Sequence, residues 1–101
     1  MAAMDLTDQQ VRTIQQWAEK AHYVREVRLF GSRAKGCARP NSDVDLAITI
    51  GVDHYVALAS QWEEQLSSLL GLTVKLAQYN AAKGIVRGYC NEFSLLLFTR
   101  D

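Results

Sequence analysis

The sequence predicts an α/β (α+β) domain in which a mixed β-sheet of about four strands is covered by helices. Two observations lead to this fold class. Apolar residues recur at helical spacing in residues 6–22 and 54–70, and short runs rich in branched residues lie between and after them. With 101 residues, 49% of them hydrophobic, the chain has room for one core. We therefore treat residues 1–101 as a single domain.

The first helix is expected over residues 6–22. Thr7 and Gln10 have the spacing of a capping box, in which each side chain binds the backbone N–H of the other residue. The apolar residues that follow recur three or four positions apart and include Trp17, which we expect in the core. Residues 24–30 (VREVRLF) alternate between apolar and charged side chains, which predicts a strand.

The middle of the chain adds a second strand and a long helix. Residues 44–50 (VDLAITI) are rich in branched side chains, as in a strand at the centre of a sheet. Residues 54–70 carry an apolar stripe at helical spacing that includes Trp62, again expected in the core. Gly71 is a natural end for this helix.

The last third is predicted to run strand, helix, strand. Residues 72–79 (LTVKLAQY) give the third strand, and residues 80–91 are expected to be helical although Gly84 and Gly88 disfavour a helix. Residues 93–100 (FSLLLFTR) give the last strand. Three consecutive leucines cannot share one face, so this strand is either covered on both sides or contributes to a dimer or partner surface.

The charge of the chain is unevenly distributed although it sums to zero. Residues 25–39 hold five of the 11 cationic residues and a single acid. This cluster is too short to form the extended basic stripe of a nucleic-acid-binding protein, so we do not expect direct nucleic-acid binding.

Other features predict the cellular setting. No apolar run approaches the roughly 20 residues that span a bilayer, and the polar N-terminus lacks the core of a signal peptide. Cys37 and Cys90 form neither a disulfide framework nor a zinc pattern. We expect a cytoplasmic protein with reduced thiols and no membrane association.

The candidate residues for binding a metal and a phosphate are concentrated in residues 29–50 (LFGSRAKGCARPNSDVDLAITI). Asp43 and Asp45 are two positions apart on the expected strand, so their side chains point to the same face of the sheet. Two carboxylates this close repel each other unless a cation lies between them. Because Mg²⁺ prefers oxygen ligands and takes the rest of its shell from phosphate and water, both are candidate metal ligands.

A candidate phosphate-binding turn precedes the aspartates. Gly31 allows backbone N–H groups to approach a phosphate, and the Ser32 hydroxyl can donate to it. Arg33, Lys35 and Arg39 can neutralise the remaining phosphate charge. Either half alone would more often be a solvated turn. The full order of strand, Gly-Ser, ten residues, Asp-x-Asp and apolar strand favours a pocket for a metal and a triphosphate.

The segments FGSRAKG and SDVDLAI resemble the minimal nucleotidyltransferase domain of the polymerase-beta-like nucleotidyltransferase superfamily. The resemblance is sharp over residues 27–50 and looser over the whole chain. It implies a mixed α/β nucleotidyltransferase fold, ATP or another NTP as donor, and Mg²⁺ or Mn²⁺ bound by Asp43 and Asp45. Gly31 and Ser32 match the positions that hold the triphosphate, and the two cations that follow in the same loop would assist.

The resemblance also implies a biological role. In this family a nucleotidyl group passes to an acceptor hydroxyl, and a third carboxylate on a later strand completes the metal site and helps to activate the acceptor. Small standalone members often act as antitoxins of a helical HEPN-type toxin and can modify that partner with AMP. The resemblance thus implies an antitoxin-type nucleotidyltransferase with Asp43 and Asp45 as catalytic residues and a HEPN-type partner.

The chain departs from the family pattern at the third carboxylate, where Lys75 stands. This exchange changes the local charge by two units, and one unit-charge pair at about 4 Å near a protein surface is worth about 4 kcal/mol before desolvation. Lys75 could pair with one of the aspartates in place of a metal. It could instead contact phosphate while the aspartates keep one Mg²⁺. Alternatively Asp53, Glu92, the acceptor or a partner could supply the missing group.

Three functions follow from these alternatives. The chain is a metal-dependent nucleotidyltransferase, or a catalytically degenerate antitoxin that neutralises its partner by contact, or a module that binds a nucleotide without transferring it. Labelled product would identify the first, a complex that survives loss of both aspartates the second, and stabilisation by nucleotide without product the third.

Overall fold

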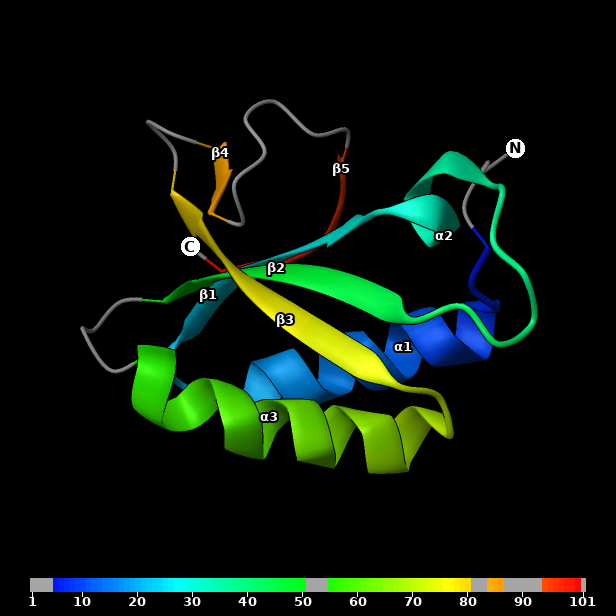
Figure 1. The fold of residues 1–101 in the computed structure, drawn as a ribbon. Coiled ribbons are helices and arrows are strands. Elements are labelled where there is room, and N and C mark those ends of the chain that lie inside the picture. Colours follow the sequence, from blue (N-terminus) through cyan, green and yellow to red (C-terminus); the bar gives the residue numbers. More distant parts are fainter. Residues whose placement is uncertain (1–4, 51–54, 81–83, 87–93, 101) are drawn as a thin grey trace.

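The computed structural model describes residues 5–50, 55–80, 84–86 and 94–100. This part of the chain contains three helices and five strands (Figure 1). The helices are α1 (Asp8–Lys20), α2 (Ser32–Lys35) and α3 (Tyr55–Leu70). The strands are β1 (Val24–Phe30), β2 (Val44–Ile50), β3 (Val74–Asn80), β4 (Gly84–Val86) and β5 (Ser94–Thr99).

The strands form one mixed sheet in the order β4-β3-β2-β1-β5. Strands β2 and β3 are parallel and are connected through α3, whereas the other three neighbouring pairs are antiparallel. A parallel pair needs such a crossover because the chain must return to the same end of the sheet. The prediction of a mixed sheet covered by helices is confirmed, with β4 as a strand beyond the four expected.

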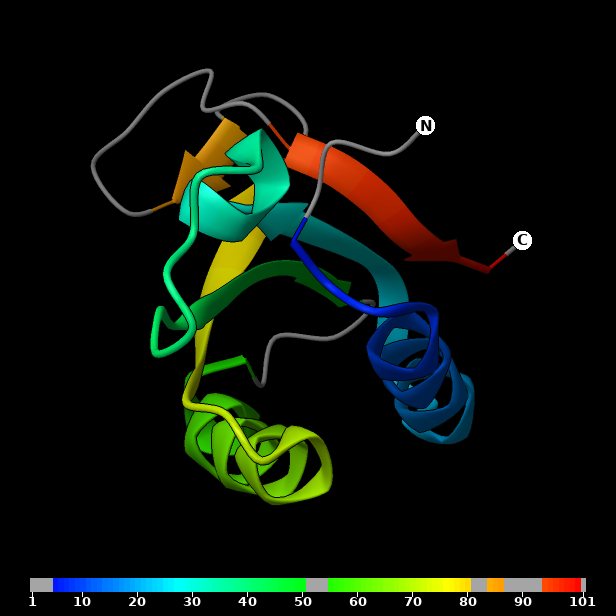
Figure 2. The same cartoon turned by 90° about the vertical axis from the view of Figure 1, so that its right-hand side faces the viewer.

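Helices α1 and α3 lie side by side on one face of the sheet, and α2 lies on the opposite side (Figure 2). The core fills the space between the sheet and the two long helices. Trp17 and Trp62 are buried there, with ring centroids 5.7 Å apart in an edge-to-face arrangement, so the prediction that both pack in the core is confirmed. Fully buried residues around them are Ile14, Leu29, Leu46, Ile48, Leu66, Val24, Val27 and Val44.

One end of each long helix follows a signal in the sequence. At the start of α1, the Gln10 backbone N–H donates to the Thr7 hydroxyl at 3.0 Å, and the Thr7 N–H donates to the Gln10 side chain at 2.9 Å. The predicted capping box is therefore confirmed. At the end of α3, Gly71 has φ 69°, a left-handed conformation that glycine adopts without steric cost.

The prediction of a helix over residues 80–91 is wrong where the structure describes it. Residues 84–86 form β4, which pairs with β3 in antiparallel register from Asn80↔Gly84 to Gln78↔Val86. Glycine and β-branched residues disfavour a helix, and an open sheet edge offers backbone partners that a helix of this sequence would have to supply itself. Residues 81–83 and 87–91 lie outside the described part.

The second face of the sheet carries a smaller apolar cluster. Phe30, Ala47 and Ala77 are buried on it, with Tyr79 packed against them. Here Leu96 of β5 is 49% exposed, whereas its neighbour Leu97 is buried in the main core. Because side chains alternate along β5, Leu96 and Leu97 point to different faces of the sheet, and the described residues do not cover Leu96. Its use as a partner surface stays a prediction.

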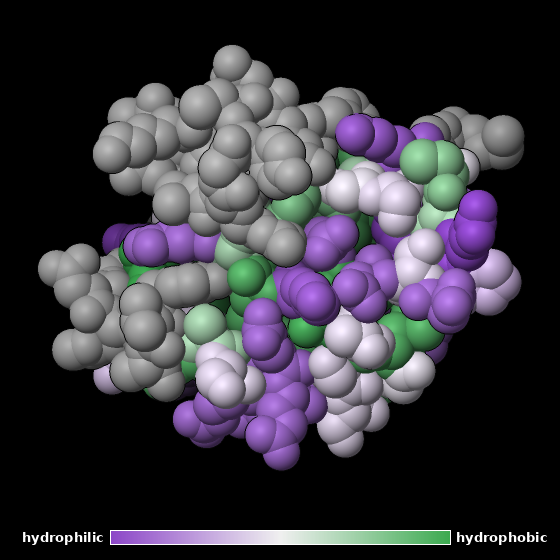
Figure 3. All heavy atoms as spheres, in the orientation of Figure 1, coloured by the Kyte–Doolittle hydropathy of each residue, from purple (hydrophilic) through white to green (hydrophobic). Residues whose placement is uncertain are grey.

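The surface in the orientation of Figure 1 is mixed in polarity. Over its described part, hydrophilic residues are interspersed with small hydrophobic areas (Figure 3). None of the described helices is long and apolar enough to cross a membrane. Cys37 is exposed and free, and Cys90 lies outside the described residues.

Candidate functional site

The Gly-Ser turn and the aspartates meet because β1 and β2 are antiparallel neighbours. Phe30, the last residue of β1, lies opposite Asp45, so the next residue, Gly31, reaches the Asp45 side chain. An ideal Cβ on Gly31 would collide with Asp45 Oδ2 and would lie 3.2 Å from Asp45 Cγ. Gly31 also has φ 76°. Both the backbone conformation and the close carboxylate therefore require glycine at this position.

Helix α2 begins directly after this glycine and is one turn long. Ser32 is its first residue and is partly exposed, while Lys35 is its last and is exposed. Gly36 ends the helix in a left-handed conformation, and its N–H donates to the Ser32 carbonyl. The helix therefore begins with Ser32 directly after the glycine that approaches the Asp45 carboxylate, and it leaves Lys35 at the surface.

The two aspartates flank a core residue. Asp43 comes immediately before β2, Asp45 is the second residue of the strand, and Val44 between them is fully buried in the core. Because side chains alternate along a strand, burial of Val44 on the helix-covered face directs both carboxylates to the other face. Both remain partly exposed to solvent, as a binding site for a charged ligand requires.

Lys75 lies beside these aspartates. It pairs with Asp45 in the parallel β2–β3 register, and its Nζ is 3.7 Å from Asp43 Oδ2. The side chains of Lys75 and Asp43 are 52% and 40% exposed, so this ion pair is long and solvated and contributes about 0–1 kcal/mol. Such a pair can open at little cost when a ligand competes for either partner.

A third acid is not found among the described residues of the site. They contain no group of three or more His, Cys, Asp or Glu side chains that could hold a metal ion. Asp53 and Glu92, the two acids considered as substitutes, both lie outside the described ranges. The described site therefore consists of two carboxylates with an ammonium next to them.

Arg33 is buried beneath the loop, with its guanidinium bound to backbone carbonyls. It is 6% exposed, and its guanidinium donates to the carbonyls of Ser42 at 2.9 and 3.2 Å, Asp5 at 2.8 Å and Pro40 at 3.3 Å. Four of its donors are thus used by the backbone of the loop that leads into β2 and by the N-terminal segment. Arg33 thus supports the loop from within, and its predicted contact with phosphate stays a prediction.

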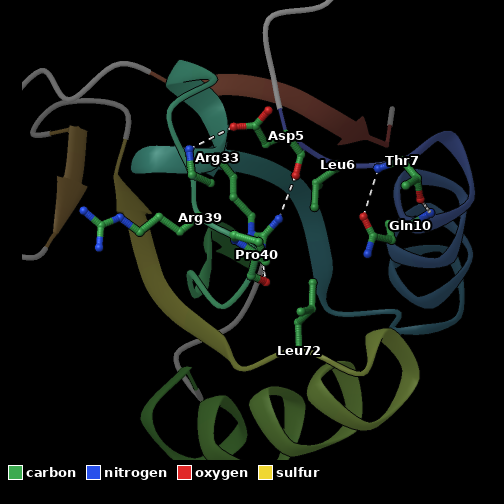
Figure 4. Close-up of a pocket in the computed structure, with 9 residues that line it drawn as sticks. Asp5, Leu6, Thr7, Gln10, Arg33, Arg39, Pro40 and Leu72 are labelled. Atoms are coloured by element: carbon green, nitrogen blue, oxygen red, sulfur yellow. Dashed lines mark hydrogen bonds between the residues drawn. The ribbon is translucent and has the colours of Figure 1, made fainter.

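Asp5 is a site-supporting residue that sequence reasoning missed. Its N–H donates to the Arg33 carbonyl at 2.7 Å, and its carboxylate accepts from the Ala38 N–H at 2.9 Å. Figure 4 shows Asp5 and Arg33 joined by a hydrogen bond beneath the loop. An isolated aspartate before a helix cap carries no signal for a contact 33 residues away.

A cleft of about 530 Å³ opens next to this network. Its lining includes neither Asp43 nor Asp45 (Figure 4). The residues that line it are Asp5, Leu6, Thr7, Gln10, Arg33, Ala38, Arg39, Pro40 and Leu72.

Comparison of the sequence with known proteins identifies its family. The family model described as "Polymerase beta, Nucleotidyltransferase" matches residues 12–101. The chain belongs to the polymerase beta nucleotidyltransferase family. It is 36% identical over 70 residues to the protein adenylyltransferase MntA of Thermococcus cleftensis, which covers 68% of this chain and 71% of that relative. The resemblance of the Gly-Ser and Asp-x-Asp segments to this family is thereby confirmed.

Two solved structures share the nucleotidyltransferase fold. One is a chain in the crystal structure of a toxin–antitoxin with AMP-PNP, with a TM-score of 0.67 and 19% identity over 89% of this chain and 73% of that chain. The other is a chain of a mutant MntA–HpeT toxin–antitoxin, with a TM-score of 0.63 and 17% identity over 90% of this chain and 73% of that chain. These likenesses confirm the fold.

The carboxylates of this nucleotidyltransferase domain fit a divalent ion. Asp43 and Asp45 lie on one face at the beginning of a central strand, and the missing side chain of Gly31 leaves room for the Asp45 carboxylate. Mg²⁺ is commonly bound by one or two carboxylates together with phosphate oxygens and water. Two carboxylates beside a glycine turn are therefore a sufficient protein contribution for a metal that arrives with a nucleotide.

Proposed function

We propose that this protein transfers a nucleotidyl group, AMP when ATP is the donor, to a hydroxyl of a partner protein, in a metal-dependent reaction. The observation that carries the proposal is the contact of Gly31 with the Asp45 carboxylate, which joins a phosphate-binding turn to a metal-binding pair. A relative that is named a protein adenylyltransferase supports AMP as the transferred group. A fold neighbour solved with AMP-PNP supports ATP as the donor.

Each residue of the site has a distinct role in this proposal. Asp43 and Asp45 would hold Mg²⁺ or Mn²⁺, which neutralises charge on the phosphates. The Gly31 backbone and the Ser32 hydroxyl bind the triphosphate, and the exposed Lys35 adds positive charge. Arg33 is assigned a supporting role because its guanidinium is occupied by backbone carbonyls.

The proposed transfer is a substitution at the α-phosphorus of the NTP. The acceptor oxygen attacks the α-phosphorus of the NTP and forms a new P–O bond. The bond from the α-phosphorus to the oxygen that bridges it to the β-phosphate breaks, and pyrophosphate leaves with that oxygen. The acceptor proton passes to water, since Lys75 stands where the family pattern has the activating carboxylate. The protein contributes mainly by orienting donor and acceptor.

The proposed partner is a helical toxin of the HEPN type. Both fold neighbours are chains of toxin–antitoxin complexes, and the relative is named MntA. We infer that this chain, as a single domain over residues 1–101, is the antitoxin of such a pair and acts in the cytoplasm. Self-association through the exposed Leu96 of β5 remains part of this proposal.

The second candidate is a degenerate antitoxin or nucleotide-binding module. The ion pair between Lys75 and Asp43 favours it, because an ammonium next to a carboxylate can replace a metal. In that case the protein binds its partner or a nucleotide without catalysing transfer.

Labelling distinguishes the two candidates. The chain is purified with a candidate helical partner protein and incubated with Mg²⁺ and ATP labelled in the α-phosphate. We expect label on the partner protein, and none when the label is in the γ-phosphate, because pyrophosphate leaves. Asp43→Asn and Asp45→Asn should abolish labelling, whereas Glu64→Gln, an exposed neutralisation on α3, should not. A stable complex without labelling would establish the second candidate.

A further inference from the structure

We propose that Lys75 supplies a fixed positive charge at the Asp43–Asp45 pair, so that the site takes one divalent ion with each nucleotide rather than two. This inference rests on the proposed function, since it concerns the metal content of the same donor site. Its starting point is the place of Lys75, whose backbone pairs with Asp45 while its Nζ lies 3.7 Å from Asp43 Oδ2.

The β2–β3 ladder prevents Lys75 from leaving the site. Neighbouring strands lie about 4.8 Å apart, and five consecutive register pairs from Val44↔Val74 to Ile48↔Gln78 fix the position of Lys75 opposite Asp45. Only the side chain can move. Because it is half exposed, it can turn from Asp43 toward a phosphate oxygen, but its charge remains beside the carboxylates.

The ligands available at the site then limit the number of divalent ions. The two carboxylates carry two negative charges and Lys75 one positive charge, which leaves a net charge of about −1 for the described site. One divalent ion can be held by the two carboxylates together with phosphate, whereas a second ion would lie near the Lys75 ammonium, which repels a cation and has no lone pair to act as a ligand. The described residues provide no third acid to offset the second ion. The Lys75 ammonium would instead neutralise phosphate charge that a second ion would otherwise neutralise.

Counting bound Mn²⁺ tests this inference directly. Equilibrium dialysis with AMP-PNP gives the ratio of bound Mn²⁺ to bound nucleotide, with Mn²⁺ followed by electron paramagnetic resonance. We expect a ratio of about one for the wild type and about two for Lys75→Asp, which adds an acid at this position. Lys20→Asp, the same charge change at an exposed residue in the last turn of α1, should leave the ratio at about one.

The outcomes separate this inference from the proposed function. A wild-type ratio of about two would overturn the role of Lys75 and leave the nucleotidyltransferase proposal intact. A ratio of about one in both wild type and Lys75→Asp would also overturn it, because Lys75 would not limit the metal content. Binding of Mn²⁺ only by Lys75→Asp would overturn both, since Lys75 would then exclude the metal altogether. Nucleotide binding by neither protein would refute the donor site itself.

Discussion

Replacement of Arg33 tests how the phosphate-binding turn is held in place. Arg33 is 6% exposed and donates four hydrogen bonds to the carbonyls of Asp5, Pro40 and Ser42. Arg33→Ala removes all four donors and leaves three carbonyls to be hydrated. We expect the variant to fold with lower stability and to bind nucleotide more weakly, because the loop that precedes Asp43 loses its internal support.

The size of the effect follows from the contacts. A hydrogen bond from a charged donor contributes about 1.5–3 kcal/mol net, so four at the lower limit sum to about 6 kcal/mol. The accepting carbonyls belong to residues near the surface, where water can replace part of the loss, and we take about half of this sum. The expected fall in the free energy of unfolding is about 3 kcal/mol. Urea unfolding followed by tryptophan fluorescence measures it, since Trp17 and Trp62 are both buried.

Lys35→Ala is the matched control on the same helix. Lys35 is exposed, so its removal should change the free energy of unfolding by less than about 0.5 kcal/mol. It should nevertheless weaken nucleotide binding, and more so at low salt, because a phosphate contact would be lost. If Arg33→Ala left stability unchanged while nucleotide binding disappeared, Arg33 would be a phosphate ligand and the supporting role would be refuted.

Two further substitutions test the close contacts of the site. Gly31→Ala should abolish Mg²⁺-dependent binding of AMP-PNP in titration calorimetry, because its Cβ would displace the Asp45 carboxylate. Gly71 has a similar φ of 69°, but nothing lies within 4 Å of a Cβ added there. Gly71→Ala should therefore cost about 1–2 kcal/mol of stability and leave binding intact. Equal binding by both variants would contradict this account. Asp5→Ala should increase hydrogen exchange of the Ala38 amide at least tenfold, equivalent to about 1.4 kcal/mol of protection. Unchanged exchange would show that the Asp5 carboxylate does not hold the loop.

The core of the fold and of the site could be predicted from local patterns. Alternation along residues 44–50 and the buried Val44 place Asp43 and Asp45 on one face, as the period of two along a strand requires. The helices follow from their apolar stripes and from the capping box at Thr7. These features depend on residues within a few positions of one another, so the sequence alone expresses them.

Other features depend on contacts that the sequence does not express. Arg33 is a residue type that often binds phosphate. Its contacts here are instead with the carbonyls of residues 5, 40 and 42, which only the folded loop brings together. Strand β4 exists because the edge of β3 offers it hydrogen-bonding partners, although residues 80–91 have no strand-like alternation. By contrast, the family resemblance already places Lys75 at the site, and the register adds that it lies opposite Asp45.

Thermal stability in the presence of nucleotide tests the donor site independently of catalysis. A ligand that binds only the folded state stabilises it by RT ln(1 + [L]/Kd), which is about 2.7 kcal/mol at 100 times Kd. For a domain of this size, 1 kcal/mol shifts the Tm by about 4–8 °C, so Mg²⁺ with AMP-PNP should raise it by about 10–20 °C. Asp45→Asn should remove most of this shift, and so should chelation of Mg²⁺ by EDTA, because the nucleotide and the metal bind together at the two carboxylates. An equal rise with and without Mg²⁺ would show that the phosphates are held by Gly31, Ser32 and Lys35 alone, with the aspartates paired to Lys75 and no metal at the site.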